Sequence, residues 1–174
     1  MFNISHSLEE KNHSQPRLAA LLTCEENIMP LAWHMPVSKS PFRYAVAVRK
    51  ENHTHGLIKK NRAFALNFLD TSYQQAYQTC GETHGGEVDK FNLSGLHKKD
   101  ALSIEGVLIQ EAYLIYECIL VDIISYGDHD IFISDVNLIL EKETKEVAPT
   151  LFMGKGYYDT PKGEPICLPR QEHV

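Results

Sequence analysis

The chain has 174 residues, enough for one domain with a single hydrophobic core. Hydrophobic residues make up 43% of the sequence and charged residues 23%, proportions typical of soluble globular proteins. The formal net charge is −6, and the short basic run at residues 59–62 is more typical of a solvated helix end than of a nucleic-acid site. We therefore expect no nucleic-acid partner.

Residues 1–15 are polar and predict a flexible N-terminal arm, which leaves residues 16–174 as one folded domain. The arm holds no apolar stretch suited to a signal peptide. No run approaches the roughly 20 apolar residues that a membrane helix requires. These features predict a cytoplasmic protein that makes no membrane contact.

The cysteines Cys24, Cys80, Cys118 and Cys167 are scattered along the chain and form no Cys-x-x-Cys motif. This spacing argues against a zinc or iron–sulfur site. Cys118 lies in an apolar run and is expected to be a reduced core residue. The nine histidines show no metal-ligand spacing either, so no metal site is predicted.

The first third of the chain is predicted to form strands joined by polar turns. The apolar run Arg17–Cys24 predicts a buried strand, because Pro16 and the short length of the run disfavour a helix. Glu25–Asn27 supplies a turn into the next strand, which carries Trp33–Ser38. The short apolar run Tyr44–Val48 predicts a strand that is buried on both faces.

Two short helices with a strand between them are expected next. Thr54 is the predicted N-cap of the first helix. Phe64–Leu69 predicts the strand that follows. Ser72 is the predicted cap of a second helix over Tyr73–Cys80, which Gly81 would end.

The second half of the chain begins with a long loop and continues as strands. Glu82–Lys99 is rich in Gly, His and charge and predicts an excursion loop of functional interest. Ala112–Ser125 predicts a long strand, and Gly127–Asp128 a hairpin turn into a partner strand over Ile131–Leu140. A last short strand is expected within Pro149–Tyr158.

Strands outnumber helices in this pattern, and the predicted helices are short. The pattern favours a mainly β fold, a small antiparallel barrel with a few short peripheral α-helices. The sequence has no Gly-x-Gly-x-x-Gly or Gly-Lys-Ser/Thr loop, so it predicts neither a dinucleotide-binding Rossmann unit nor a P-loop. No nucleophile elbow or Cys/His arrangement of a covalent catalyst stands out.

The start of the predicted helix at Thr54 is a candidate phosphate site. A helix N-terminus offers unpaired N–H groups and a partial positive charge. Thr54 would add a hydroxyl donor, and Arg49 or Lys50 just upstream a full charge. The alternative is that Thr54 only caps its helix and Arg49 is a solvated strand end.

The segment Trp33–Ser38 is a candidate wall for a flat aromatic ring. Prolines in and before it, Pro36 and Pro30, would leave backbone groups unpaired by neighbouring strands and open to a ligand. Asn27 and Ser38 are polar residues within apolar runs and need hydrogen-bond partners. Trp33 and Met35 fit a pocket wall or an ordinary core equally well.

A set of short motifs keeps a fixed order along the chain. They are Asn27-Ile28-Met29-Pro30-Leu31-Ala32-Trp33, Pro36-Val37-Ser38, Ser40-Pro41, His53-Thr54, Phe64-Ala65-Leu66-Asn67, Asp89-Lys90-Phe91, Ser94-Gly95-Leu96, Glu117-Cys118 and Gly127-Asp128-His129. In order and spacing the set resembles the flavin reductase-like, FMN-binding split-barrel family, in particular its flavoredoxin-like branch. The resemblance extends over roughly residues 17–140, most of the chain.

The resemblance implies a Greek-key split β-barrel that forms a homodimer, with FMN near the subunit interface. It also implies that the Asp89–Phe91 loop meets the flavin and that His129 is a candidate contact of the nicotinamide. The cofactor-binding residues that we expect are Asn27, Trp33, His34, Met35, Pro36, Val37, Ser38, Arg49, Asn52, His53, Thr54, Asn67, Lys90 and Phe91.

The function expected from this resemblance is that of an FMN-binding oxidoreductase. Such a protein passes electrons from NAD(P)H to flavin, as a flavin reductase does, or to an acceptor protein, as a flavoredoxin does. Its partners would be NAD(P)H or a redox partner protein. The alternative is a non-catalytic flavin- or haem-binding module on the same barrel, because a shared fold does not fix function.

Overall fold

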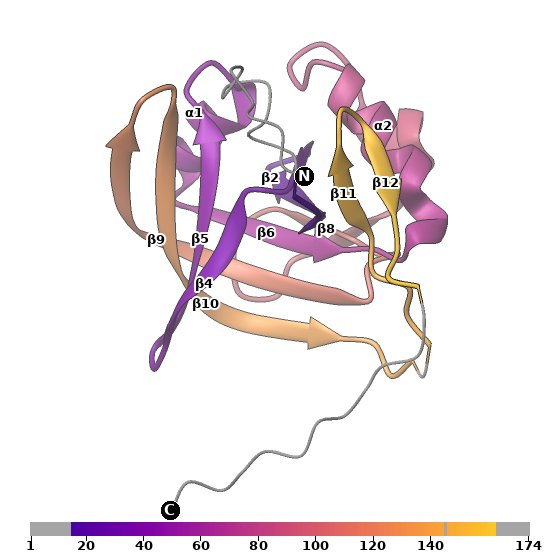
Figure 1. Cartoon of the computed structure of the whole chain (residues 1–174). Helices are drawn as coiled ribbons and strands as arrows, with labels where there is room; N and C mark the ends of the chain where they lie inside the picture. Colours follow the sequence, from indigo (N-terminus) through magenta and orange to yellow (C-terminus); the bar gives the residue numbers. More distant parts are fainter. Residues whose placement is uncertain (1–14, 145, 163–174) are drawn as a thin grey trace, which may run out of the picture.

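The computed structural model describes residues 15–144 and 146–162 (Figure 1). Its main sheet has seven antiparallel strands in the order β3-β2-β6-β9-β10-β5-β4. Their bounds are β2 (Ala20–Cys24), β3 (Asn27–Leu31), β4 (His34–Lys39), β5 (Phe42–Arg49), β6 (Ala63–Phe68), β9 (Leu114–Tyr126) and β10 (His129–Glu141). This curled sheet confirms the mainly β split barrel that the sequence predicts.

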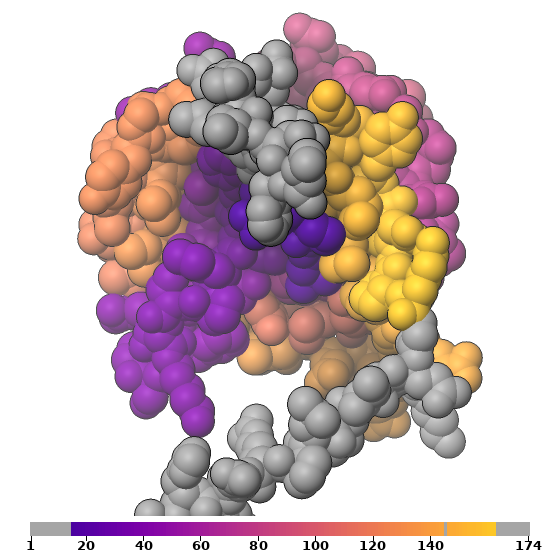
Figure 2. Space-filling view, viewed as in Figure 1, coloured from indigo at the N-terminus to yellow at the C-terminus, as the bar shows by residue number. Residues whose placement is uncertain are grey.

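Two smaller sheets and short helices complete the described fold. One sheet joins β1 (Arg17–Leu18), β11 (Leu151–Gly154) and β12 (Tyr157–Asp159), and the other joins β7 (Lys98–Asp100) and β8 (Val107–Ile109). The helices are α1 (His53–Asn61), the 3-10 turn η2 (Thr71–Tyr73), α2 (Gln74–Glu82) and α3 (Lys90–Ser94). The hairpin β11–β12 stands beside α2, across the N-terminal strands from the β4–β5 hairpin (Figures 1 and 2).

The long strands β9 and β10 bend as they cross the molecule. Their pairing shifts register between Ile133 and Ser134 and again between Val136 and Leu138. Each shift places an extra residue in the ladder, which bends the strand and increases its twist. Strand β10 pairs with β9 over His129–Glu141 and with β5 over His129–Asp135, and the two irregularities bend it as the sheet curls into a barrel.

Apolar residues pack on both faces of the sheet. One cluster lies within the curl and includes Leu22, Phe64 and Phe132, all buried. A second cluster lies on the other face, where Leu21 packs with Tyr77 of α2. Strand β2 contributes alternate residues to both clusters, which is why its sequence is apolar except for Thr23, a buried residue that accepts a hydrogen bond from Asn67.

The predicted strands are present, although the predicted strand Arg17–Cys24 is divided into β1 and β2, and β7 and β8 were not predicted. The predicted strand within Pro149–Tyr158 is a hairpin of two strands, β11 and β12. The predicted loop Glu82–Lys99 contains helix α3, which begins after Asp89 because the Asp89 side chain accepts a hydrogen bond from the backbone N–H of Asn92.

Both predicted helix caps were wrong. Helix α1 has Asn52 as its N-cap, with extended backbone angles, and Thr54 lies inside its first turn. The helical segment after β6 is capped by Asp70, whose carboxylate accepts from the Ser72 N–H. The α2 helix also continues through Gly81 to Glu82, since a glycine in mid-helix is tolerated at a cost of about 1 kcal/mol.

The predicted N-terminal arm, apart from residue 15, and Cys167 lie outside the described residues. The other three cysteines, Cys24, Cys80 and Cys118, are free and buried. This confirms Cys118 as a reduced core residue. Its complete burial raises the pKa of its thiol, so it has little thiolate character.

A buried ion pair connects α1 to β10. His55 Nε2 lies 2.8 Å from Asp130 Oδ2, and the Ser125 hydroxyl donates to the other carboxylate oxygen at 2.7 Å. Lys50 Nζ is 3.6 Å away from the same carboxylate. The hydrogen bonds from His55 and Ser125 lower the pKa of Asp130 to about 2.

The lowered pKa of Asp130 predicts how the free energy of unfolding changes at low pH. Because the pKa of Asp130 in the fold lies below the ordinary aspartate value of about 3.9, its ionised form stabilises the protein above about pH 4. That contribution is lost as the pH falls toward 2. We expect the Asp130→Asn variant to lose less stability than the wild type in urea unfolding between these pH values. Parallel losses in the two proteins would contradict this assignment.

Candidate functional site

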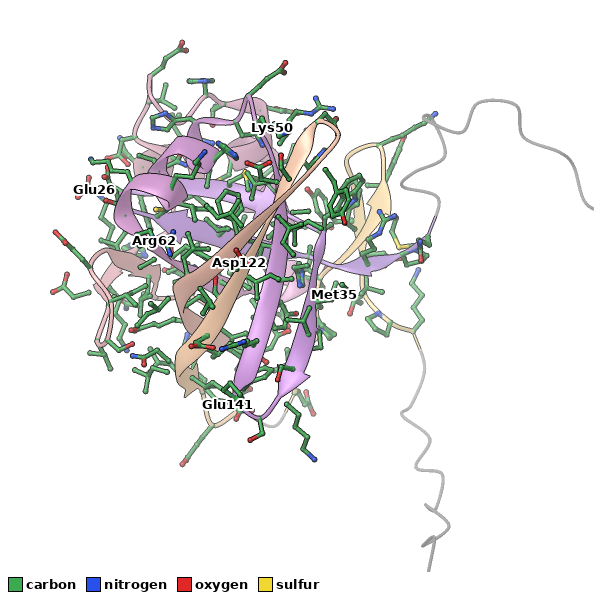
Figure 3. All side chains as sticks on the ribbon, turned by 90° about the vertical axis from the view of Figure 1, so that its left-hand side faces the viewer. Glu26, Met35, Lys50, Arg62, Asp122 and Glu141 are labelled. Carbon is green, nitrogen blue, oxygen red and sulfur yellow. The ribbon has the colours of Figure 1, made fainter. Side chains whose placement is uncertain are left out.

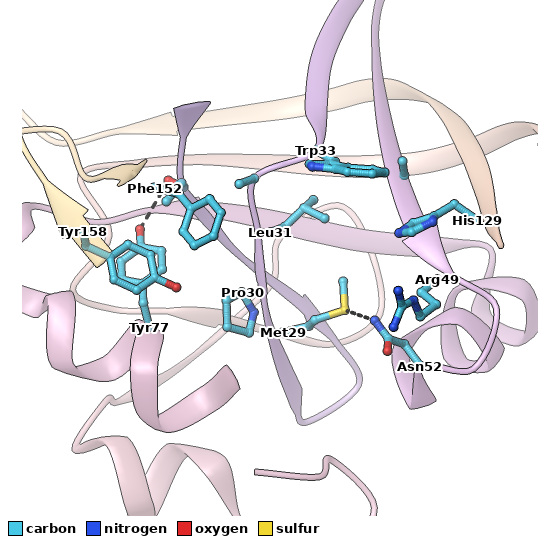
Figure 4. A pocket seen from close by; sticks show the side chains of 13 residues that line it. Met29, Pro30, Leu31, Trp33, Arg49, Asn52, Tyr77, His129, Phe152 and Tyr158 are labelled. Atoms are coloured by element: carbon cyan, nitrogen blue, oxygen red, sulfur yellow. Dashed lines mark hydrogen bonds between the residues drawn. The ribbon is translucent and has the colours of Figure 1, made fainter. Parts of the chain in front are cut away.

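An apolar hollow lies between the end of β3 and the β11–β12 hairpin (Figure 4). Its cavity volume is about 250 Å³, and we call it the ring hollow. Its lining is mostly apolar and aromatic, with a few polar groups. The residues that line it are Ala19, Met29, Pro30, Leu31, Ala32, Trp33, Ala47, Arg49, Asn52, Tyr77, His129, Phe152 and Tyr158.

One end of the ring hollow is formed by Trp33 and His129. Their rings are stacked, with centroids 4.7 Å apart and planes 28° apart. His129 Nδ1 hydrogen-bonds to Asp128 at 2.6 Å, which orients the imidazole and holds the pKa of Asp128 below its usual range. Arg49 lies 3.4 Å from the other oxygen of Asp128. The turn between β9 and β10 thus fixes the His129 ring against the tryptophan.

The opposite end is an aromatic wall from helix α2 and the β11–β12 hairpin. The Tyr158 ring centroid lies 5.3 Å from that of Tyr77 and 5.6 Å from that of Phe152. The Tyr77 hydroxyl donates to the carbonyl oxygen of Ala19, which fixes this buried side chain. Figure 4 shows the three rings facing Trp33 and His129 across Leu31 and Pro30.

A second, more polar hollow adjoins the ring hollow at the start of α1. It has a cavity volume of about 300 Å³, and we call it the polar hollow. The two hollows share Met29, Pro30, Asn52 and Tyr158 in their linings. The further residues of the polar hollow are Asn27, Glu51, His53, Thr54, Cys80, Gly81, Thr83, His84, Gly85 and Lys90.

Asn27 and Thr54 form the floor of the polar hollow. Both are buried, and Asn27 Nδ2 donates to Thr54 Oγ1 at 2.8 Å. Asn27 Oδ1 is buried without a hydrogen-bond partner, and it lies where a Cβ atom on Gly85 would be. The N-cap Asn52 makes no side-chain capping bond; its Nδ2 instead contacts the Met29 sulfur at 3.4 Å. The N–H groups of the first turn therefore have no side-chain cap.

Lys90 brings a buried ammonium group to the same hollow. Its side chain is 5% exposed, and Nζ donates to the carbonyl oxygens of Ile28 and Cys80 at 2.8 and 2.7 Å. Burial lowers the pKa of Lys90 from its ordinary value. The two carbonyls occupy two of its three donors, so one N–H remains for a ligand.

The structure brings most of the predicted site residues to these two hollows. Trp33, Arg49 and His129 line the ring hollow, and Asn27, Asn52, His53, Thr54 and Lys90 line the polar hollow or both. Arg49 and Lys50, the predicted phosphate cations, both point to the β9–β10 turn, where Lys50 Nζ donates to the Gly127 carbonyl.

The other predicted site residues lie elsewhere. Met35 and His34 line a separate hollow on the far side of Trp33, and Pro36, Val37 and Ser38 line a shallow one near the β4–β5 turn. His34 is held by hydrogen bonds to Tyr44 and to the Leu18 carbonyl. Such a set of partners is typical of a structural side chain.

Asn67 and Phe91 have structural surroundings too. Asn67 is fully buried; its Nδ2 donates to the Leu21 carbonyl and to Thr23, and its Oδ1 accepts from the Ile109 N–H. Phe91 is buried within the core cluster beside α2.

Several residues of the hollows were not singled out from the sequence. Tyr77, Phe152 and Tyr158 come from segments far apart in the chain, so no local pattern marks them. His84 and Gly85 lie within the loop Glu82–Lys99, whose length and composition did indicate a functional segment.

A split barrel whose aromatic hollow continues into a polar hollow at a helix N-terminus suits a ligand with a flat ring and a phosphate tail. The family model described as "Flavin reductase like domain" matches residues 13–161. The chain therefore belongs to the flavin reductase-like family, which confirms the resemblance seen in the sequence motifs.

Solved structures of known proteins share this fold. The FMN-binding protein from Thermus thermophilus, with bound p-hydroxybenzaldehyde, matches with a TM-score of 0.85 and 25% identity over 97% of this chain and 99% of that chain. Flavoredoxin from Methanosarcina acetivorans matches with a TM-score of 0.83 and 22% identity over 96% of this chain and 94% of that chain. At the latter identity the likeness shows the fold alone.

Curated proteins give a shorter match. A protein from Aeropyrum pernix is 30% identical over 112 residues, which are 64% of this chain and 43% of that protein. The chain thus covers less than half of this relative's length. Within the described residues, no helix is long and apolar enough to cross a membrane, and no three His, Cys, Asp or Glu side chains are grouped to hold a metal ion.

Proposed function

We propose that the protein binds FMN, with the isoalloxazine ring in the ring hollow and the ribityl phosphate in the polar hollow. The observation that carries this proposal is the continuity of the two hollows through Met29, Pro30, Asn52 and Tyr158. An aromatic half suits a tricyclic ring, and a half with a helix N-terminus and a buried ammonium suits a phosphate.

Each part of the flavin would meet a group of matching chemistry. Trp33 and Phe152 offer apolar contact at the two ends of the ring hollow. The Thr54 hydroxyl and the first N–H groups of α1 offer donors to the phosphate.

We further propose that the protein is an oxidoreductase that passes electrons from NAD(P)H to flavin or to an acceptor protein. When bound, FMN supplies the hydride chemistry, because its ring accepts and releases electron pairs. The role of the protein is then to hold two flat rings together. His129, fixed by Asp128 and stacked on Trp33, is in a position to orient the nicotinamide.

A homodimer is also proposed. The strands β4, β9 and β10 carry exposed apolar side chains that a second copy would cover. Met35 is 59% exposed, and Figure 3 shows it on the side of the sheet that carries β4. The other exposed large hydrophobic residues of these strands are Val37, Ile119, Val121, Tyr126 and Ile139.

The FMN proposal predicts a fluorescence change from a single residue. Trp33 is the only tryptophan of the chain and lines the ring hollow. A flavin ring there accepts its excitation energy, so we expect FMN to quench most of the emission, while AMP leaves it unchanged. Flavin should elute with the protein in gel filtration, at the volume of a dimer. Unquenched emission together with flavin-free protein would contradict the proposal.

The same complex separates a reductase from an electron carrier. Under anaerobic conditions, NADH or NADPH is expected to bleach the absorbance of the bound oxidised flavin. Bound flavin that dithionite bleaches and neither nucleotide does would show an electron carrier that another protein reduces.

A further inference from the structure

Two histidines are among the side chains that can supply positive charge to the polar hollow. Among the described residues that line it, the side chains able to carry positive charge are His53, His84 and Lys90. The Lys90 ammonium already donates to two carbonyl oxygens. A phosphate dianion in this hollow would therefore depend on the two histidines for further charge.

His53 and His84 approach each other across the polar hollow from different elements. His53 is the first residue of α1, and His84 lies in the loop after α2, with ring centroids 5.9 Å apart. The Gly86 N–H donates to His84 Nδ1 at 3.4 Å, a long hydrogen bond that only the neutral ring can accept; protonation of His84 would release this bond and make both ring nitrogens donors. Both side chains are exposed, so both can exchange protons with solvent.

Building on the proposed FMN site, we propose that His53 and His84 bind the phosphate monoester of the flavin in their protonated forms. Two imidazolium rings at this separation repel each other. A phosphate dianion between them would offset this repulsion and accept one charge-assisted hydrogen bond from each ring. The pair thus binds the phosphate end of FMN and makes no contact that riboflavin, which lacks phosphate, would use.

Most of the acidic side chains near His53 and His84 are hydrogen-bonded to other residues. Glu25 is engaged by Lys60 and Asn61, Glu26 by Lys98, and Asp89 caps α3. Glu51 lines the polar hollow and opposes an anion there, so the histidine charges offset it. The remaining titratable groups that line the hollow are Cys80, Lys90 and Tyr158.

The proposal fixes the direction of the pH dependence. Histidine ordinarily titrates near pH 6.5, and a phosphate monoester loses its second proton near pH 6. A dianion favours the protonated histidines, so the complex is stabilised at about pH 6 to 7 and loses that stabilisation as the pH rises further. Each histidine charge that is lost should weaken FMN binding by about tenfold, the effect of one pKa unit of coupling.

Titrations of Trp33 emission with FMN and riboflavin, from about pH 6 to 8.5, test the proposal. In the wild type, FMN affinity should fall as the pH rises, and riboflavin affinity should stay constant. His53→Gln and His84→Gln should each flatten the FMN profile, and the double variant should bind FMN with an affinity that does not change with pH and that exceeds the riboflavin affinity by less than in the wild type. His97→Gln is the matched control, because His97 is exposed and pairs with Glu111 outside both hollows.

Titration calorimetry in two buffers of different ionisation enthalpy measures how many protons the protein takes up when it binds FMN. The wild type should take up protons on binding FMN near pH 7.5, and the double variant should take up none. FMN binding by the double variant with the wild-type pH profile would overturn the histidine proposal while leaving the FMN site intact. No binding of either flavin at any pH would overturn the proposed function itself.

Discussion

Replacing Glu117 with alanine is expected to lower the free energy of unfolding by about 3 kcal/mol. Glu117 is fully buried on β9, where its carboxylate accepts hydrogen bonds from the Leu102 N–H at 2.9 Å and from the Ser103 N–H and hydroxyl at 2.6 Å each. Truncation leaves two backbone N–H groups without their acceptor and opens a void beneath the segment after β7.

Urea unfolding followed by circular dichroism measures this change. Glu117→Gln keeps the shape of the side chain but turns an amide toward N–H donors, so we expect a smaller loss of stability. Asp122→Ala is the control on the same strand; its exposed carboxylate bonds only to the neighbouring Ile123 N–H, and its loss should cost less than about 0.5 kcal/mol. Equal losses in the Glu117 and Asp122 variants would contradict the anchoring role.

The strands were predictable because burial leaves a repeated pattern in the sequence. Strand β2 is apolar except for Thr23 because both its faces are buried, and the long β9–β10 hairpin is marked by β-branched runs around Gly127. The curl of the sheet was not visible in this pattern. It depends on register shifts at Ser134 and Val136, which come from pairing between strands and have no local signature.

The start of helix α1 shows that capping preferences alone do not determine which residue is the N-cap. Asn52 and Thr54 are both good capping residues, and spacing alone does not choose between them. In the structure the Thr54 hydroxyl accepts from buried Asn27, so it belongs to the wall of the polar hollow. Thr54 lines the polar hollow, so its role at a ligand stays a prediction, whereas its expected role as the helix cap was wrong.

The polar hollow and the aromatic wall of the ring hollow also differ in how clearly the sequence marks their residues. The polar hollow draws on Asn27 and on the start of α1, whose polar residues stand out within apolar runs. The aromatic wall depends on Tyr158 and Phe152, which reach the hollow because β11 pairs with β1, more than 130 positions earlier in the chain. Such a contact leaves no mark on the sequence near either residue.

Replacing Gly85 with alanine is expected to weaken FMN binding by roughly a hundredfold, which corresponds to about 2.7 kcal/mol. A Cβ at Gly85 would overlap Asn27 Oδ1, and the carboxamide is short, buried and bonded to Thr54, so it cannot turn away without breaking that bond. The displaced Asn27 would enter the polar hollow and lose its hydrogen bond to the Thr54 hydroxyl, which lies where we propose that the phosphate binds.

Gly86→Ala is a closely matched control, one residue further along the same loop. A Cβ there meets no atom closer than 3.7 Å, an ordinary van der Waals contact with the rings of His53 and His84. Both variants lose the same backbone freedom, so only the overlap with Asn27 differs between them. Titration of Trp33 emission with FMN should show near wild-type affinity for Gly86→Ala and the large loss for Gly85→Ala alone. Similar affinities in the two variants would show that the Asn27–Thr54 pair does not hold the phosphate end of the ligand.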